Sequence, residues 1–200
     1  MNRSNFTALA FAVPAVLTLA ACGDQRAPTE AARPLNPQVA LSREGQHAGA
    51  IVAHDNCDPA TFNAALNDPD ACVKHGHQTF QSFIAELQAT QVARDWRFTP
   101  EQITGRFGVG LLGNNVGGEE HTFTPVHAFG GGFIPILNQL TGNLVPAPEC
   151  LNLDEDDVVA SGAKYLIEAD ELEEVADGSG IARVQCCIHP WMRTEVRMKG

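Results

Sequence analysis

The hydrophobic residues of this chain follow a helical period from Thr79 to about residue 91 and a period of two from Arg94 onward. Helical spacing comes first, because a face of apolar residues recurs at i, i+3, i+4 and i+7. From Arg94 onward, short stretches alternate apolar and polar residues, as half-buried strands do. The sequence therefore predicts a small helical part followed by strands. The helical face comprises Phe80, Phe83, Ile84 and Leu87, and the alternating residues include Trp96, Phe98, Thr194, Val196 and Met198.

Turn signals separate the short alternating stretches. Asn114 to Gly118 is a predicted turn, and Glu119 to Thr124 is the strand expected to follow it. Further strands are predicted at 164–168 and 181–187, after a long connection at 130–153 that contains three prolines. Many short strands with closely spaced turns favour an all-β sandwich or barrel. The long connection suits a Greek-key crossover between two sheets better than a hairpin.

The helical part begins with a favourable capping sequence. Asp58 is a good N-cap residue and Pro59 fits the first helical position, which predicts a helix over Ala60 to Leu66. Cys57 and Cys72 bracket this helix and the turn after it. We expect a disulfide between them, because it would close a short loop and restrict the unfolded chain.

The first residues have the composition of a secretory signal peptide. Arg3 provides a short positive region, and Phe6 to Ala20 form an uncharged apolar run that is short for a membrane span. Two alanines precede Cys22, a pattern that resembles a bacterial lipobox and predicts lipidation of that cysteine. The alternative is ordinary signal cleavage nearby, with Cys22 incidental. Residues 1–21 are therefore a predicted lipoprotein signal peptide, and residues 22–45 a predicted flexible tether.

Charge and export limit the class of partner. The formal net charge of −11 argues against nucleic-acid binding, because phosphate neutralisation requires Lys and Arg. Export with a lipid anchor would place the protein on a bacterial membrane, facing the periplasm or the cell exterior, where cysteines pair. The acidic runs at 154–157 and 168–177 are expected to be solvated loops. Docking of a positively charged redox partner is the alternative role for them.

A short stretch near the C-terminus contains three ligand types that favour copper. Cys186, His189 and Met192 stand in the spacing Cys-x-x-His-x-x-Met. Thiolate, imidazole and thioether together select copper over metals that prefer oxygen. A blue-copper centre also needs a second imidazole, which has to come from elsewhere in the chain. The alternative is that Cys186 and Cys187 are buried structural cysteines beside a surface histidine and a core methionine.

Together with the sequence His-Thr-Phe-Thr at residues 121–124, this stretch resembles the copper loops of the cupredoxins, the family of plastocyanin, azurin and amicyanin. The short Cys-x-x-His-Pro-x-Met form is most similar to amicyanin. The resemblance spans residues 92–200 and implies a Greek-key cupredoxin β-sandwich. Residues 46–91 would then be a small helical N-terminal extension.

The resemblance also implies which residues bind the metal. Cys186 stands at the position of the ligand cysteine, and His189 and Met192 follow it. His121 stands where the family places its first histidine ligand, just after an Asn/Gly turn. His127 is the competing histidine, although a proline between the two should end the strand.

The alternation of side chains along a strand predicts which way Cys187 and two neighbouring acids point. Cys187 should face away from the metal if Cys186 faces it. With Cys22 set aside and Cys186 assigned through the resemblance, four cysteines remain and allow three pairings. The most economical set joins Cys57 to Cys72 and Cys150 to Cys187. Glu119 and Glu120 are expected to be a solvated pair, because neighbours on a strand point to opposite faces.

The resemblance implies an exported electron carrier with one type 1 copper ion and no enzymatic activity. Its partners would be redox proteins, such as a cytochrome or a copper enzyme, and the lipid anchor would hold a monomer at the membrane. A copper-binding or copper-delivery protein with the same ligands is the alternative from another class. A structural domain with a lost site is a third, and the presence of all four ligand types disfavours it.

Overall fold

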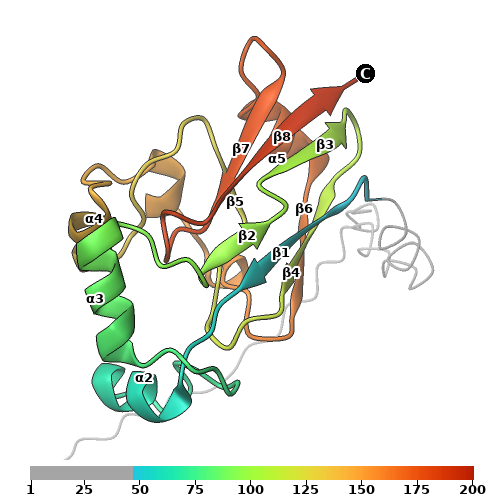
Figure 1. Ribbon diagram of the computed structural model, residues 1–200. Helices are drawn as coiled ribbons and strands as arrows, with labels where there is room; N and C mark the ends of the chain where they lie inside the picture. The colour runs from blue at the N-terminus through green and yellow to red at the C-terminus, as the bar shows by residue number, and fades with distance from the viewer. Residues whose placement is uncertain (1–46) are drawn as a thin grey trace, which may run out of the picture. The chain divides into compact units, whose positions relative to one another are not determined.

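Two four-stranded sheets form the framework of residues 47–200, the part of the chain that this computed structural model describes (Figure 1). The predicted signal peptide, the tether and Cys22 lie outside the described residues. The strand order is β2–β1–β4–β6 in the first sheet and β3–β8–β7–β5 in the second. This arrangement confirms the expected all-β sandwich with a small helical segment. The strands are β1 (Ala50–His54), β2 (Arg97–Thr99), β3 (Gln102–Arg106), β4 (Leu111–Asn115), β5 (Thr124–Val126), β6 (Lys164–Ile167), β7 (Ile181–Gln185) and β8 (Arg193–Lys199).

Each sheet contains one parallel pair of strands among antiparallel ones. β1 runs parallel to β4, with Val52 opposite Asn114 and Ala53 opposite Asn115. β3 runs parallel to β8. Parallel neighbours end at the same edge of a sheet. The residues that follow β1 are therefore brought against the residues that follow β4.

Alternation along the strands supplies the core between the sheets. In β8, Thr194, Val196 and Met198 are buried and the residues between them are more exposed, as the sequence predicts. In β1, the buried residues are Ile51 and Ala53. Removing such apolar faces from water is the main favourable term in folding.

β1 corrects the expected domain boundary. The sequence predicts that residues 46–91 lie outside the sandwich, but β1 lies inside the first sheet, between β2 and β4. The helical segment is therefore an insertion between β1 and β2, and residue 92 is not where the sandwich begins. The pattern of apolar residues did not reveal β1 because its first four residues are all apolar, so the strand lacks the alternation of apolar and polar residues.

The region around the predicted Asn/Gly turn also differs from expectation. Asn114 and Asn115 end β4, and the turn begins after them. Residues 119–123 do not form the predicted strand, and their pairing consists of one isolated bridge between His121 and Val159. This segment is held mainly by hydrogen bonds to side chains and not by the regular backbone hydrogen bonds of a β-sheet.

Pro125 does not end the strand as predicted. It lies within β5, paired opposite Val184. β5 is at the edge of its sheet, where proline is tolerated because no further strand needs its missing N–H.

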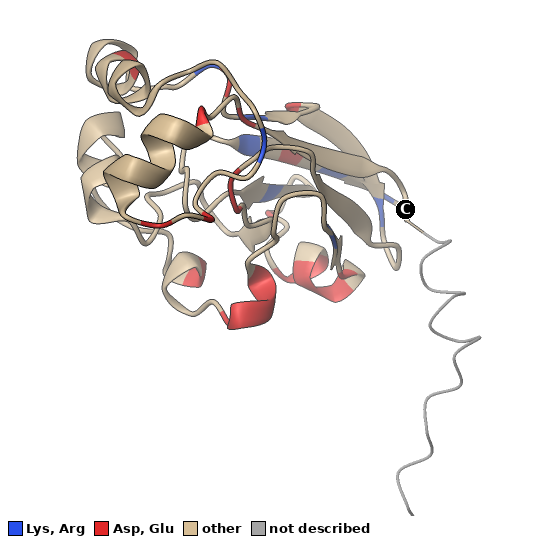
Figure 2. Cartoon of the chain, turned by 90° about the horizontal axis from the view of Figure 1, so that it is seen from below, with Lys and Arg blue, Asp and Glu red and all other residues tan. Residues whose placement is uncertain are grey.

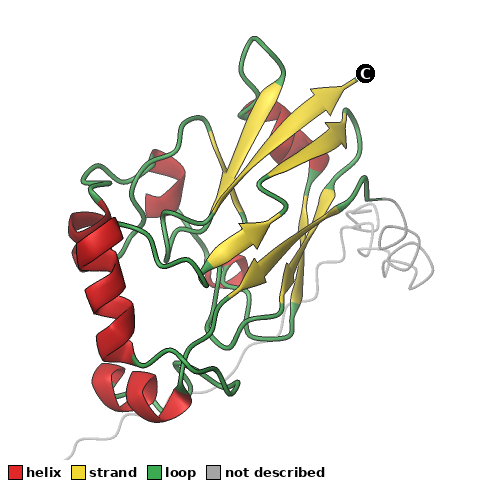
Figure 3. Cartoon of the chain, viewed as in Figure 1, coloured by secondary structure: helices red, strands yellow, loops and turns green. Residues whose placement is uncertain are grey.

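The predicted helices form, and they stand together beside the strands (Figure 3). α2 (Pro59–Leu66) begins after Asp58, whose side chain accepts a hydrogen bond from the first turn at 3.4 Å. α3 (Phe80–Thr90) buries Phe83 and Leu87 of the predicted apolar face. The shorter helices are α4 (Pro135–Thr141), η1 (Pro148–Leu151), η2 (Glu155–Asp157) and α5 (Ala169–Glu174).

An aromatic cluster joins the helical insertion to the C-terminal loop. Phe62 stacks on Trp96 with ring centroids 5.6 Å apart, and Phe83 lies 4.5 Å from Trp96. Trp191 packs against Phe83 at 6.0 Å. Its indole N–H donates to the backbone carbonyl of Trp96 at 3.0 Å. The insertion therefore packs directly against the loop that contains the candidate ligands.

Within residues 47–200, none of the helices combines the length and apolar character that crossing a membrane would require.

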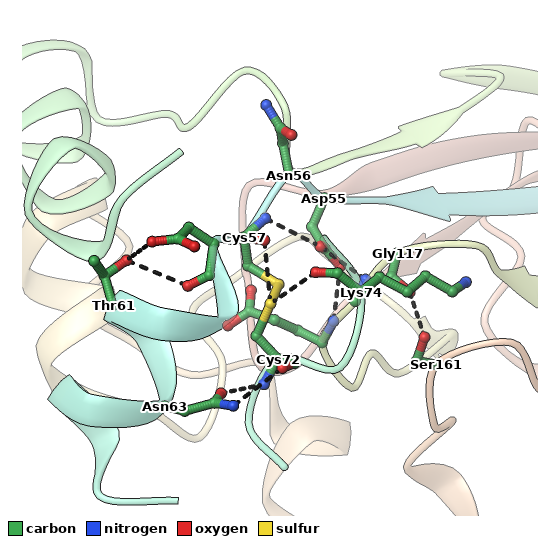
Figure 4. The surroundings of a disulfide bond; sticks show 12 residues. Asp55, Asn56, Cys57, Thr61, Asn63, Cys72, Lys74, Gly117 and Ser161 are labelled. Carbon is green, nitrogen blue, oxygen red and sulfur yellow. Dashed lines mark hydrogen bonds between the residues drawn. A yellow bond between two sulfur atoms is a disulfide. The ribbon is translucent and has the colours of Figure 1, made fainter. Parts of the chain in front are cut away.

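Two disulfides brace the sandwich at separate places. Cys57 and Cys72 are bonded and lie beside the turn that follows β4 (Figure 4). Cys150 and Cys187 are bonded, which ties η1 to the segment just after β7. Cys186 is the one free cysteine among the described residues, and it is buried.

Replacing each disulfide by a pair of serines should lower the free energy of unfolding. The bonds close loops with separations of 15 and 37 residues. In the chain-entropy model these loops correspond to about 3 and about 4 kcal/mol. Urea denaturation of Cys57→Ser/Cys72→Ser and Cys150→Ser/Cys187→Ser would measure both losses. A loss below about 1 kcal/mol in either would contradict the expectation.

Candidate metal centre

Segments that are distant in sequence meet at one edge of the sandwich. β1 and β4 end side by side, so Asp55 lies against the turn at residues 116–120. The backbone N–H groups of Gly118 and Glu119 donate to the Asp55 carboxylate at 2.8 and 3.0 Å. These hydrogen bonds of Asp55 set the position of the turn and of His121, which follows it. Cys186 reaches the same edge because it directly follows β7.

The side chain of Asn115 holds the same turn from inside. Its amide nitrogen donates to the carbonyls of Glu119 and Val159 at 2.8 and 2.9 Å, and its oxygen accepts from the Gly117 N–H at 2.9 Å. A Cβ at Gly117 would overlap the carboxylate of Asp55. Figure 4 shows Gly117 and Asp55 together beside the disulfide. The close approach of backbone and carboxylate therefore requires a glycine.

The loop from Cys186 to Met192 is closed by its own backbone. The Cys186 N–H donates to the carbonyl of Met192 at 3.0 Å, and the Met192 N–H donates to the carbonyl of His189 at 2.9 Å. The Cys187 N–H donates to the hydroxyl of Thr122 at 2.8 Å. The loop is thereby fixed both to itself and to the segment that contains His121.

Two imidazoles and one thiol converge in the buried space between this loop and the segment that contains His121. The Sγ atom of Cys186 lies 3.7 Å from Nδ1 of His121 and 3.8 Å from Nδ1 of His189. The ligand atoms of the three residues all lie within 4.8 Å of one another. All three residues are buried, and Met192 is buried in the same core cluster. Within residues 47–200 this is the one group of at least three potential metal-binding side chains of these types.

The surroundings of Cys186 favour its thiolate form. Burial alone would raise the pKa of the thiol, but the hydrogen bonds and charges of His121 and His189 lower it well below the usual value. The backbone N–H groups of Thr122 and His189 each lie 3.4 Å from the sulfur. A thiolate is the form that acts as a metal ligand.

The outer nitrogen of His121 faces a buried carboxylate. Nε2 of His121 lies 2.9 Å from Oδ2 of Asp55, and both side chains are almost fully buried. Although burial opposes the charge on each group, this contact lowers the pKa of Asp55 to about 2. Together with Cys186, the same contact raises the pKa of His121 to about 9.

The outer nitrogen of His189 also faces a carboxylate, which corrects an expectation. Glu119 and Glu120 are expected from the sequence to be a solvated pair, but Glu119 is buried and only Glu120 is exposed. Oε2 of Glu119 lies 3.6 Å from Nε2 of His189 and accepts a hydrogen bond from the indole N–H of Trp96. Burial raises the pKa of Glu119.

The structure brings together the histidines and the cysteine that the sequence analysis selected. His121, Cys186 and His189 form the cluster, and the backbone of Met192 bonds to two of them. The competing His127 is exposed and lies 2.7 Å from Glu149.

Asp55 and Glu119 were missed as residues of the site. Glu119 had a usable signal, since it stands two residues before His121 and so shares its side of an extended chain. Asp55 had none, because only the pairing of β1 with β4 brings it to the site.

The donor set fits a soft or borderline metal. The inner group offers one sulfur and two nitrogens, with a thioether in the same loop. Calcium and magnesium prefer oxygen ligands, whereas thiolate, imidazole and thioether together suit copper. His121, Cys186, His189 and Met192 are the residues that would hold such an ion.

Comparisons with known proteins give likenesses at low identity. No protein-family model matches the chain, and no curated protein matches it. Among solved structures, the chain is similar to a purple cupredoxin from Nitrosopumilus maritimus, at 13% identity over 54% of this chain and 87% of that chain, with a TM-score of 0.35. It is similar to plastocyanin from Dryopteris crassirhizoma at 17% identity over 52% and 89%, with a TM-score of 0.30. It is also similar to auracyanin from Roseiflexus castenholzii at 15% identity over 52% and 88%, with a TM-score of 0.29. Scores this low carry no functional conclusion, which has to come from the donor set of the chain itself.

The contact between Asp55 and His121 predicts how stability depends on pH in the copper-free protein. Because the pKa of Asp55 is lowered to about 2 from 3.8, its contribution is present above about pH 4 and is lost as the pH falls through 2. The wild type should therefore exceed Asp55→Asn in free energy of unfolding by about 2 kcal/mol more at pH 5 than at pH 2. Chemical denaturation at several pH values measures this difference. A difference that stays constant from pH 5 to pH 2 would contradict the prediction.

Proposed function

We propose that this chain is an exported copper protein that carries single electrons between redox partners. His121, Cys186, His189 and Met192 would hold one type 1 copper ion, with Met192 as the weakest of the four ligands. The observation that carries this proposal is the convergence of two imidazoles and one thiol within 4.8 Å in a buried site. Those donors, with a methionine three residues after the second histidine, are the set of a blue-copper centre.

The protein contributes a fixed arrangement of donors. Bound copper would supply the chemistry by alternating between copper(I) and copper(II). The hydrogen bond between Cys187 and Thr122 and the disulfide of Cys187 with Cys150 restrain the ligand loop on the side of the second sheet. Restrained donors would keep nearly the same positions in both oxidation states, which supports rapid transfer of one electron. Electron transfer of this kind requires no substrate-binding site.

Burial of the donors favours a carrier over a copper-delivery protein. His121 and Cys186 are 0% exposed and His189 is 3% exposed. Delivery of a metal ion requires ligands of the acceptor protein to reach the ion, and this enclosure hinders that exchange. Transfer of an electron requires no such access.

The proposal places the protein outside the cytoplasm. The signal-like residues 1–21 and the lipobox-like sequence before Cys22 support export and attachment to a bacterial membrane. The two disulfides support an oxidising compartment. The protein would act there as a tethered monomer that exchanges electrons with a cytochrome or a copper enzyme.

A pocket over His189 is the proposed face for a redox partner. Its lining contains apolar residues near the imidazole, among them Ile134 and Ile188, with acidic residues at its border. Two of those acids, Asp68 and Asp70, are exposed. Acids also gather on short helical segments elsewhere, at η2 and α5, as Figure 2 shows, but these do not line the pocket. Charge complementarity favours a partner with a basic surface.

The first test of this proposal is a visible spectrum with copper(II) added. The full chain with Cys22→Ser, which prevents lipidation, should show an intense thiolate-to-copper band. Cys186→Ser should abolish the band because it removes the thiolate. The matched control, Cys150→Ser/Cys187→Ser, should keep it because Cys187 is bonded away from the metal. Absence of the band in the parent chain, or its persistence in Cys186→Ser, would contradict the proposal.

The second test concerns the acidic border of the pocket. Reduced protein should be oxidised by cationic hexaamminecobalt(III) more slowly as salt is added, because screening weakens the attraction. Asp68→Asn/Asp70→Asn should lower the low-salt rate several-fold. The control Asp156→Asn/Glu174→Gln makes the same charge change on η2 and α5 and should lower the rate less. A larger effect of the control pair would place the docking face at η2 and α5 instead.

A further inference from the structure

The outer imidazole nitrogens of His121 and His189 each face a buried carboxylate. Neither carboxylate is one of the candidate metal ligands, and neither has a role in the proposed function. Nε2 of His121 lies 2.9 Å from Asp55, and Nε2 of His189 lies 3.6 Å from Glu119. The side chain of Asp55 is 1% exposed and that of Glu119 is 10% exposed. Asp55 is therefore shielded from water, whereas Glu119 is mostly buried at the wall of the pocket over His189.

The geometry defines the tautomer of each imidazole. In His121 and His189, Nδ1 is the nitrogen turned towards Cys186. A nitrogen that binds a metal uses its lone pair, so the ring hydrogen has to be on the outer nitrogen. In His121 it can donate to Asp55 at 2.9 Å, an arrangement that orients a ligand histidine and raises its basicity. Glu119 lies 3.6 Å from Nε2 of His189, beyond hydrogen-bond distance, and would act on that imidazole through its charge.

Each carboxylate is itself held by donors. Asp55 accepts from the N–H groups of Gly118 and Glu119 at 2.8 and 3.0 Å. The oxygen of Glu119 that faces His189 also accepts from the indole of Trp96. Trp96 is fully buried in the aromatic cluster of the helical insertion. The insertion between β1 and β2 thereby places the donor that holds Glu119 at the metal centre.

We propose that Asp55 is a positioning residue that orients the imidazole of His121, and that Asp55 and Glu119 together hold the reduction potential of bound copper down. This inference rests on the proposed function. Ionised carboxylates beside the ligands would stabilise copper(II) more than copper(I), because the attraction grows with the charge of the ion. The effect is strong because buried charges are screened little by solvent or salt.

Reduction potentials of copper-loaded variants test the inference. Asp55→Asn and Glu119→Gln keep shape and remove charge. Each should favour copper(I) over copper(II) by roughly tenfold, an upward shift of about 59 mV for one electron. Asp55→Asn/Glu119→Gln should lie above both single variants, and Glu119→Asp, which keeps the charge, should lie below Glu119→Gln. The shifts should persist at high salt.

The matched control is Glu149→Gln. Glu149 also pairs with a histidine, at 2.7 Å from His127, but that histidine is exposed and outside the cluster. Its substitution should leave the potential unchanged. If Asp55→Asn does not fold, as judged by circular dichroism, Glu119→Gln and Glu119→Asp decide the matter.

The outcomes separate this inference from the proposed function. A parent chain with the thiolate-to-copper band whose charge-removing variants match the Glu149→Gln potential would overturn the inference alone. Equal potentials for Glu119→Asp and Glu119→Gln would overturn it too, since only packing would then matter. A parent chain without the band would overturn the proposed function and this inference with it.

Discussion

The parallel pairing of β1 with β4 is the constraint on which the site depends. Both strands end at one edge, and Asp55 receives there the backbone N–H groups of Gly118 and Glu119. The same carboxylate lies 2.9 Å from Nε2 of His121. One short side chain therefore joins the end of a strand, a turn and a candidate ligand. A shift of register between the two strands would separate all three, because side chains alternate with a period of two.

The C-terminal loop is held by an independent set of contacts. Its backbone closes from Cys186 to Met192, and the disulfide of Cys187 with Cys150 anchors the segment after β7. The adjacent cysteines thus have different roles, with one turned into the buried cluster and the other bonded to η1. Since the loop and the turn after β4 come from different sheets, the packing of the sheets decides how far apart the donors lie.

The helical insertion adds a layer over the loop from Cys186 to Met192. Its aromatic cluster surrounds Trp96, which hydrogen bonds to Glu119, and Trp191 packs against Phe83 of α3. The apolar face that gave α3 its helical period is therefore also the face that covers the loop. The aromatic cluster around Trp96 therefore both packs the insertion against the loop and holds the Glu119 carboxylate beside His189.

The sequence by itself determined what local chemistry can show. Strand alternation in β8, the cap of α2 by Asp58 and the ligand spacing from Cys186 to Met192 depend on neighbours in the chain. Only the tertiary structure decided that β1 belongs to the sandwich and that Asp55 lies at the site, since parallel pairing joins segments some 60 residues apart. It also decided that Glu119 is buried while its neighbour is exposed, because burial depends on what packs over a side chain rather than on the side chain itself.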